Sequence, residues 1–155
     1  MKLSKIFVAL ILGLAATGCE NEMKMDMPAN FVELNTEFTP YELRSVDADR
    51  IVVACRKEMN LKKATPAFWE SMVREALEAK GYKFEKDSEI RNSENKQGKL
   101  LEFKFRTKAH TYKYFVAIFT TEKYVLIGEA GGFEMKMQAK RDEILNSFRS
   151  LRYGN

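Results

Sequence analysis

Two stretches near the middle of the chain are apolar on both faces of a strand. Residues 114–119 read Tyr-Phe-Val-Ala-Ile-Phe, and residues 124–127 read Tyr-Val-Leu-Ile. A strand that faces water on one side alternates apolar and polar side chains, so an unbroken apolar run predicts a central strand that is covered on both faces. The rest of the chain must therefore supply two layers that cover one sheet.

Two segments have the spacing of covering helices. The first is predicted to begin with Thr65 as N-cap and Pro66 in the first turn, and to end at Gly81. Its apolar residues recur at helical spacing, and they are Trp69, Met72, Val73, Ala76 and Leu77. The second helix is predicted from Met137 onward. Its apolar stripe consists of Ile144, Leu145, Phe148 and Leu151.

The other periodic segments predict strands. They are expected at residues 31–34, 41–46 and 50–56 before the first helix, and at 82–91, 100–107, 112–119 and 123–130 after it. The order is β-β-β-α-β-β-β-β-α, which places the chain in the α+β class. We expect one antiparallel β-sheet of six to seven strands sandwiched between helices, in a single globular domain over residues 31–155. A chain of this length can bury a core without disulfide bonds.

The first 18 residues have the pattern of a secretory signal peptide. Lys2 and Lys5 precede an apolar run over residues 6–16, which is shorter than the roughly 20 residues that a membrane-spanning helix needs. Residues 16–19, Ala-Thr-Gly-Cys, resemble the bacterial lipobox. This resemblance implies cleavage before Cys19 and acylation of its sulfur. The alternative is a free or disulfide-bonded Cys19 after ordinary signal cleavage.

Acylation would attach the domain to a membrane. One acyl chain binds a bilayer only marginally, whereas two or three give a stable anchor. Glu20 follows the cysteine, and by resemblance to proteobacterial lipoproteins this favours the outer membrane, with the domain facing the periplasm. We therefore expect a lipoprotein of the bacterial cell envelope, whose partners are the membrane, through acylated Cys19, and an envelope protein.

The charge balance argues against nucleic acid as a partner. Without residues 1–18 the chain carries 24 basic and 22 acidic residues, a formal charge of +2. A nucleic-acid-binding protein needs a clustered basic surface. One predicted hairpin carries several basic residues, Lys104, Arg106, Lys108 and Lys113. We interpret them as a solvated strand face, with contact to anionic headgroups or to an acidic patch as the alternative.

Residues 19–30 are predicted to form the lipidated cysteine and a flexible tether. The segment after Cys19 is polar and lacks a regular apolar pattern. Met23, Met25 and Met27 stand at alternate positions within it. Thioethers are soft ligands that suit Cu(I), so a weak copper site is the alternative to a plain tether.

Residues for the common kinds of catalysis are scarce. The one histidine, His110, lies in a polar turn, and no nucleophile motif accompanies it. With Cys19 acylated, Cys55 has no intramolecular partner. Its place on an apolar strand face predicts a small buried side chain, with a reactive thiol as the alternative. We expect no zinc site of the usual kind, no cofactor and no enzymatic activity.

Glu129 is the most informative ionisable residue. It lies in the apolar segment Val-Leu-Ile-Gly-Glu-Ala, residues 125–130, near the end of a strand expected to be central. A buried carboxylate without a partner is costly, so Glu129 should pair with Lys or Arg, or should line a cleft. A structural ion pair is one interpretation, and a ligand or partner site near Glu129 and Trp69 is the other. Gly128, Gly131 and Gly132 are predicted to form a turn into the second helix.

Several segments together resemble a group of bacterial lipoproteins. They are residues 49–54 (Asp-Arg-Ile-Val-Val-Ala), 67–70 (Ala-Phe-Trp-Glu), 80–82 (Lys-Gly-Tyr), 112–119, 129–132 (Glu-Ala-Gly-Gly) and 144–151. That group is similar in fold to the photosystem II extrinsic protein PsbP, the periplasmic protein DcrB and a eukaryotic Ran-binding import factor. The resemblance covers residues 31–152. It implies an α/β/α sandwich without enzymatic activity, which serves larger assemblies as an accessory or docking domain.

Three kinds of function remain open on these grounds. They are docking to an envelope complex, carriage or sensing of a small apolar ligand or lipid, and an enzymatic activity of an unrecognised type. Fold analogy does not choose between them. An exposed apolar patch would favour docking, a large apolar cavity would favour a carrier, and facing carboxylates in a concave site would favour an enzyme.

Overall fold

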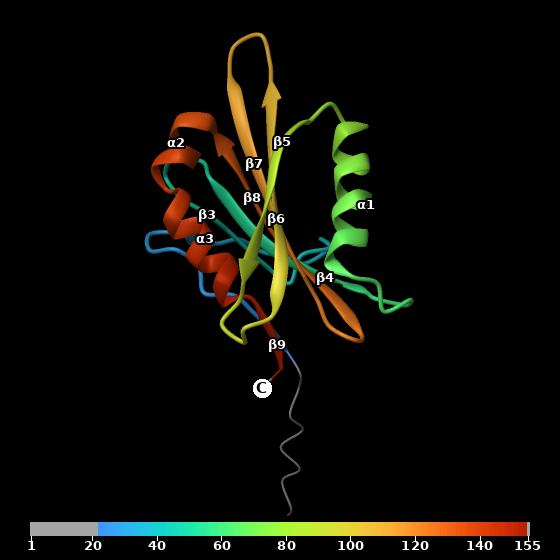
Figure 1. Ribbon diagram of the computed structural model, residues 1–155. Coiled ribbons are helices and arrows are strands. Elements are labelled where there is room, and N and C mark those ends of the chain that lie inside the picture. Colours follow the sequence, from blue (N-terminus) through green and yellow to red (C-terminus); the bar gives the residue numbers. More distant parts are fainter. Residues whose placement is uncertain (1–21, 155) are drawn as a thin grey trace, which may run out of the picture.

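The strands that are apolar on both faces lie inside a seven-stranded antiparallel sheet. The computed structural model describes residues 22–154. The strands of this sheet are β2 (Val32–Glu33), β3 (Leu43–Val46), β4 (Val52–Met59), β5 (Lys83–Arg91), β6 (Gln97–Arg106), β7 (Thr111–Thr120) and β8 (Tyr124–Phe133). Their spatial order is β2-β3-β4-β8-β7-β6-β5 (Figure 1). β7 and β8 are each paired on both sides, which confirms their prediction as central strands.

Helices cover both faces of this sheet. α1 (Pro66–Glu78) lies on one face, and α2 (Glu134–Ala139) and α3 (Arg141–Ser150) lie on the other (Figure 1). The α+β sandwich expected from the sequence is therefore confirmed, with the predicted order of elements from β2 to α3. The second helix differs in one respect, because it is divided at Lys140, where φ is −104° and ψ is 16°.

Two ion pairs hold the junction of α2 and α3 against the sheet. Lys140 Nζ lies 2.6 Å from Asp47 Oδ2, and Arg141 donates a hydrogen bond to Glu102 Oε1 at 2.5 Å. Asp47 and Glu102 are buried, and a buried carboxylate needs a cation or several donors close to it. These contacts fix the corner between the two helices over the sheet.

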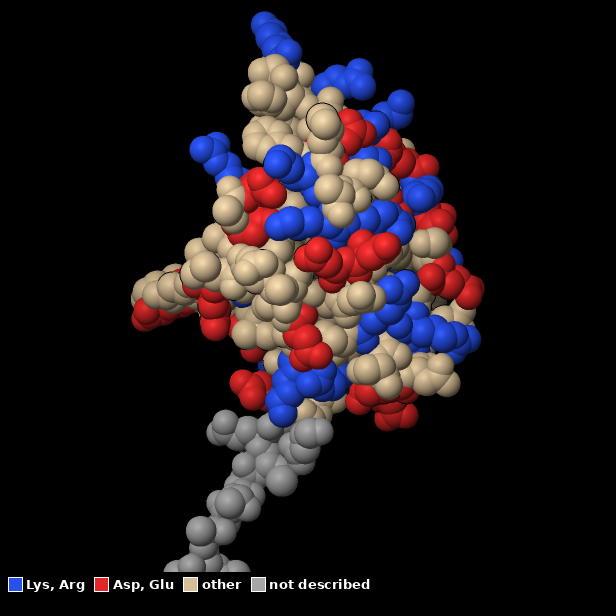
Figure 2. Space-filling model, turned by 90° about the vertical axis from the view of Figure 1, so that its left-hand side faces the viewer, with Lys and Arg blue, Asp and Glu red and all other residues tan. Residues whose placement is uncertain are grey.

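The face that carries α2 and α3 has mixed charge. Figure 2 shows Lys and Arg side chains interspersed with Asp and Glu side chains over this face. Two lysines of the predicted basic set follow the same pattern, because Lys104 and Lys113 both pair with Glu85. These two side chains therefore belong to a solvated strand surface whose charge is neutralised locally.

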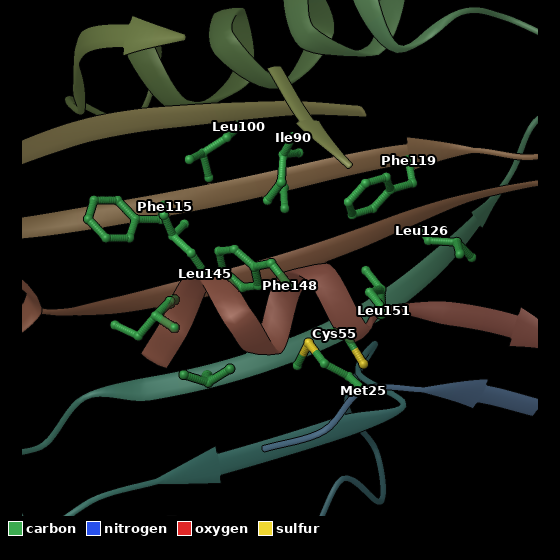
Figure 3. Close-up of a cluster of buried hydrophobic side chains, with 14 of the residues drawn as sticks. Met25, Cys55, Ile90, Leu100, Phe115, Phe119, Leu126, Leu145, Phe148 and Leu151 are labelled. Atoms are coloured by element: carbon green, nitrogen blue, oxygen red, sulfur yellow. The ribbon is translucent and has the colours of Figure 1, made fainter. Parts of the chain in front are cut away.

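The main core lies between the sheet and α3. Phe148 of α3 is fully buried, and its ring packs so closely on Gly128 of β8 that an added Cβ would lie 2.8 Å from it. Figure 3 shows Leu145 and Phe148 among buried side chains of the sheet, Phe115 included. The predicted stripe is confirmed, because Ile144, Leu145, Phe148 and Leu151 are all buried.

The side chains of α1 are less buried than those of α3. It begins as predicted, because Thr65 Oγ1 accepts a hydrogen bond from the backbone N–H of Phe68 at 3.4 Å. Three of its side chains pack against the sheet, and they are Trp69, Val73 and Leu77. Met72 and Ala76 are exposed, so the predicted apolar stripe is too wide at these two positions. No helix of the described residues is long and apolar enough to span a bilayer.

The chain enters the domain through a short second sheet, in which β1 (Glu22–Lys24) pairs antiparallel with β9 (Arg152–Gly154). Met23 and Met25 are buried in the core under α3, and Met27 packs at its border. The prediction of a flexible tether is therefore wrong from β1 onward. The alternating methionines are the period-two pattern of a segment that covers a core, and the polar residues between them face solvent.

Candidate functional site

One face of the sheet is only half covered by a helix. α1 packs on β5, β6 and β7, and its apolar side chains share one buried cluster with Val125 and Ile127 of β8. Among the described residues, no helix packs in the same way on β3, β4 or the part of β8 that carries Glu129 (Figure 1). Because side chains alternate along a strand, positions 52, 54 and 56 of β4 and positions 129 and 131 of β8 share this face. We call these residues, together with Tyr41 and Tyr114, the open face.

Glu129 lies within the open face and forms an ion pair. Its Oε1 lies 3.4 Å from a guanidinium nitrogen of Arg56, which also pairs with Glu58. The Glu129 side chain is 12% exposed. Its second oxygen, Oε2, is buried and has no hydrogen-bond donor among residues 22–154. The expected cationic partner is therefore present, and the Tyr41 side chain interacts with the same carboxylate. The second oxygen still lacks a donor at hydrogen-bond distance among the described residues.

A pocket of about 150 Å³ lies beside Glu129. Its walls include Tyr41, Arg44 and Tyr114, and Gly131 forms part of its lining. The Tyr114 ring packs on Gly131, where an added Cβ would lie 2.9 Å from it. β8 continues through Gly131 and Gly132, so the predicted turn at these glycines is wrong. Glycine is required here because the tyrosine ring lies directly on the strand.

The two tyrosines beside Glu129 are held in the neutral form. Burial and the nearby Glu129 carboxylate raise the pKa of the Tyr41 phenol above its usual value. The same two causes raise the pKa of the Tyr114 phenol. Both hydroxyl groups therefore stay protonated at neutral pH, so the pocket combines hydrogen-bond donors with the carboxylate acceptor of Glu129.

A larger pocket of about 450 Å³ adjoins the first, because Tyr114 and Gly131 line both. Its other lining residues include Tyr82, Phe105 and Tyr112. The ring centroid of Tyr82 lies 5.2 Å from that of Phe105 and 5.3 Å from that of Tyr114. Such separations are typical of aromatic rings that pack on one another. The open face therefore continues into a series of aromatic side chains.

The aromatic series extends to the hairpin between β6 and β7. Tyr112 stacks on Phe133 with ring centroids 5.0 Å apart, and His110 lies 5.1 Å from Phe133. His110, Phe133 and Met135 line a third pocket of about 480 Å³. Met135 is 85% exposed. Methionine and aromatic side chains that reach solvent supply adaptable apolar contact area.

The structure separates two residues that the sequence placed together. Trp69 donates a hydrogen bond from Nε1 to Asn60 Oδ1 at 3.3 Å, and it lines none of the three pockets above. None of these three pockets is lined by both Glu129 and Trp69, because Trp69 packs against the buried residues of the sheet under α1. Cys19, the predicted lipidation site, lies outside the described residues. Within residues 22–154, no three His, Cys, Asp or Glu side chains are grouped as a metal site.

Three residues of the open face were not singled out in the sequence, namely Tyr41, Arg56 and Tyr114. Arg56 carried a usable signal, because it is a charged residue that ends a largely apolar strand, as Glu129 nearly does on another strand. Opposite charges at such positions are candidates for a pair across a sheet. The sequence does not show that the strand of Arg56 pairs with the strand of Glu129, and without this the pair could not be predicted.

Cys55 is a buried apolar side chain. It is fully buried in the core under α3 (Figure 3), and this burial raises the pKa of its thiol to about 12. Reactive cysteines lie in partly exposed, electropositive surroundings that lower the thiol pKa. The alternative of a reactive thiol at Cys55 is therefore not supported.

We predict that Cys55 makes the fold less stable at high pH. Between the ordinary thiol pKa of 9.0 and about 12, the unfolded chain loses the Cys55 proton and the folded chain keeps it. The contribution of Cys55 to the free energy of unfolding is therefore full below about pH 9 and falls as the pH rises. Denaturant unfolding of the wild type and Cys55→Ala at a series of pH values measures this contribution, since all other titrating groups are shared. A stability difference that stays constant up to about pH 11 would contradict the raised pKa.

Proteins of known structure share this arrangement of strands and helices. LpqN of Mycobacterium tuberculosis, which is involved in cell envelope biogenesis, matches with a TM-score of 0.65 at 11% identity, over 91% of this chain and 88% of LpqN. The cyanobacterial PsbP protein of Synechocystis, CyanoP, matches with a TM-score of 0.63 at 7% identity, over 92% of this chain and 98% of CyanoP. PA94 of Pseudomonas aeruginosa, a protein of unknown function described as a putative regulator, gives a TM-score of 0.50 at 13% identity, over 88% and 86%.

These likenesses show that the chain has the PsbP-like fold, as the resemblance of its segments implied. At 7% to 13% identity they extend to the fold alone. The sequence matches no protein-family model, and no curated protein matches it by sequence. What the domain binds must therefore be argued from its own open face.

Proposed function

We propose that this protein is a non-enzymatic, lipid-anchored accessory module of the bacterial cell envelope, which docks a protein partner on its open face. The signal pattern of residues 1–18 and the lipobox that ends at Cys19 support export and acylation. LpqN, which has the same fold, is involved in cell envelope biogenesis, and this supports the same compartment. Attachment to the outer membrane, with the domain in the periplasm, is part of the proposal.

The observation that carries the docking proposal is the incomplete environment of Glu129. Oε2 is buried without a donor, while the nearby Arg56 also serves Glu58. A buried acceptor without a partner costs about 1–3 kcal/mol. A partner protein that places a lysine ammonium or a backbone N–H in the adjoining pocket would remove this cost, so the missing donor favours association.

The surroundings of Glu129 supply apolar contact area for such a partner. Tyr112 lines the pocket of about 450 Å³, which adjoins the Glu129 pocket through Tyr114. Phe133, which stacks on Tyr112, and Met135 line the pocket of about 480 Å³ beyond it. Aromatic residues and methionine are enriched at protein interfaces, whereas lysine and glutamate are depleted there. The open face therefore combines one buried charge that needs a donor with an apolar border.

A carrier of a small apolar molecule is the second candidate function. The pocket lined by Tyr82, Phe105 and Tyr112 has a volume of about 450 Å³, which lies within the range of about 300–1,000 Å³ that is typical of small-molecule sites. The two functions differ in the occupant, because a carried molecule would remain with the purified protein when no protein partner is present.

Photo-crosslinking in cells distinguishes the two functions. A photoreactive amino acid replaces Tyr112 or Met135 in the full chain, and the control position is Glu75, which is exposed on α1 away from the open face. Docking predicts one protein crosslinked at positions 112 and 135 and not at 75. Glu129→Gln, which keeps the shape of the side chain but removes its charge, should lower the yield about tenfold, because a hydrogen bond to a charged group contributes about 1.5–3 kcal/mol.

The opposite results are equally specific. The same protein crosslinked with equal yield at all three positions would contradict docking on the open face. A small molecule that copurifies at one per chain, without a crosslinked protein, would establish the carrier function instead. Native mass spectrometry of the protein extracted from membranes detects that molecule.

A further inference from the structure

The described structure begins close to the predicted acylation site. β1 starts at Glu22, three residues after Cys19. Three fully extended residues span at most about 11 Å. With the acyl chains of Cys19 in a bilayer, the entrance of the domain therefore lies within about 11 Å of the lipid headgroups. The end of the molecule that carries β1 must face the membrane.

Two loops lie beside β1 and β9 at this end. Tyr153 of β9 packs on Tyr124 with ring centroids 4.7 Å apart, which places the β7–β8 loop next to β9. The backbone N–H of Asn60 donates to the carbonyl oxygen of Lys123 at 2.8 Å, which joins the β4–α1 loop to the β7–β8 loop. Figure 1 shows the β7–β8 loop at the end of the sheet where the C-terminus lies, the β4–α1 loop to its side, and the β6–β7 hairpin at the opposite end.

These two loops present an apolar side chain among lysines. Leu61 is 83% exposed in the β4–α1 loop, Lys62 and Lys63 follow it, and Lys123 lies in the neighbouring loop. The contact of Lys63 with Glu122 is long, at 4.0 Å, and joins two exposed side chains, while Lys62 and Lys123 form no ion pair within residues 22–154. We call Leu61, Lys62, Lys63 and Lys123 the basic rim.

Tyrosine rings lie directly behind the basic rim. The Nζ of Lys123 is 5.1 Å from the centroid of the Tyr124 ring, and the Nζ of Lys57 is 5.5 Å from that of Tyr153. At a bilayer surface, tyrosine rings lie at the level of the headgroups, and lysines are attracted to anionic lipids. The lysines and tyrosines at this end of the domain therefore match the bilayer surface, which the short segment between Cys19 and Glu22 would place next to them.

We propose that the basic rim docks on the surface of an anionic phospholipid bilayer, with Leu61 in the headgroup region and its three lysines against lipid phosphates. The proposal rests on the acylation of Cys19, which is part of the proposed function. Burial of an exposed leucine in the headgroup boundary is favourable, and each lysine close to an anionic surface raises the affinity about fivefold. The acyl chains then hold the domain, and the rim sets its orientation.

This orientation directs the proposed docking site away from the membrane. β7 contains ten residues between the β6–β7 hairpin and the rim, a length of about 33 Å. Tyr112 lies at the start of β7, next to the β6–β7 hairpin, and Phe133 pairs with it at the end of β8. The aromatic part of the open face therefore stays accessible to a partner while the rim contacts lipid.

Quenching by lipids tests the orientation. The full chain, purified from membranes, is reconstituted in vesicles of phosphatidylglycerol and phosphatidylcholine, and it carries a fluorophore at Leu61→Cys or, as the control, at Lys108→Cys in the hairpin. Cys55 is fully buried and does not compete for the label. A quencher attached to the headgroups should quench the label at position 61 at least about threefold more than at 108, because the two ends are about 33 Å apart.

A charge variant tests the role of the lysines. Lys62→Gln/Lys63→Gln/Lys123→Gln should lower the quenching of a label at position 61 about twofold or more, since the remaining attraction is apolar. The matched control is Lys80→Gln/Lys83→Gln/Lys108→Gln, which removes three exposed lysines elsewhere and should leave the quenching unchanged. Equal effects of the two triple variants would overturn the assignment of the basic rim.

Mass spectrometry of the same samples separates the failure of this inference from the failure of the anchor. An acylated chain whose labels at positions 61 and 108 are quenched equally would overturn the proposed orientation and leave the anchor intact. A chain without acyl mass on Cys19 would overturn the anchor, and the inference that rests on it would fail with it.

Discussion

Phe148→Ala is expected to lower the free energy of unfolding by about 3–5 kcal/mol. The Phe148 side chain is fully buried between α3 and the sheet, and its ring packs directly on Gly128. Removing the ring forfeits its apolar burial and leaves a cavity that the rigid strand below cannot fill. Urea denaturation followed by circular dichroism measures the change, on the protein with Cys19 replaced by Ala so that it can be handled without detergent.

Phe38→Ala is the matched control, because it makes the same chemical change at a side chain that is 97% exposed. Its effect should stay within about 0.5 kcal/mol, as for most surface substitutions. If the two variants lost similar stability, the assignment of the core to the space under α3 would be wrong.

Met23→Asp is expected to lower the free energy of unfolding by about 3 kcal/mol or more. Met23 is 2% exposed, although it lies in a segment that the sequence analysis took for a tether. Aspartate at this position would place a charge in an apolar core. For a domain of this size the loss corresponds to a fall in Tm of about 10 °C, which differential scanning calorimetry detects.

Met135→Asp provides the comparison for Met23→Asp. Met135 is 85% exposed, and it lies in the first turn of α2, where an acidic residue is favourable. This variant should keep the wild-type Tm to within about 2 °C. Equal and small effects of both substitutions would restore the interpretation of residues 22–30 as a tether.

The main sheet was predictable because the pattern of apolar and polar residues in each strand indicates which of its faces are buried. β7 and β8 each contain an unbroken apolar run, and β6 alternates Leu101, Phe103 and Phe105 with charged residues. The boundaries were less predictable. β8 runs on through Gly131 and Gly132 because Tyr114 and Ile51 pack on these two glycines, and a glycine that accommodates a neighbouring side chain is indistinguishable in sequence from a glycine in a turn.

The pairing of β1 with β9 was not predictable from local patterns. Each strand has only three residues, and they lie at opposite ends of the chain. Alternate methionines among polar residues in a short segment also suit a tether. The second helix was predicted as one element because the residues at its break, Lys140 and Arg141, contact groups distant in sequence, namely Asp47 in the β3–β4 turn and Glu102 on β6.

The acidic residue of the candidate site could be predicted from the sequence, but the residues that surround it could not. Glu129 was identified because an acid inside an apolar strand demands a partner. Arg56 is 73 residues away in sequence, and it meets Glu129 only through the register of β4 and β8. Trp69 was placed near Glu129 because both were expected between a helix and the sheet, but the α1 side chains pack on β8 only as far as Val125 and Ile127.

The pairing of β1 with β9 also constrains the order in which the domain can be completed. In the proposed export from the N-terminus, Met23 and Met25 would cross the membrane long before Arg152–Gly154, which contains the strand partner of β1. The two thioether side chains then have no strand beside them, and the closing contact joins segments near the two ends of the described chain, which is a slow kind of contact to form. β1 would therefore cross first and pair with its partner strand last. Chaperones would then meet this segment in an unpaired state, and a protein that lacks Arg152–Gly154 would leave β1 without its partner strand.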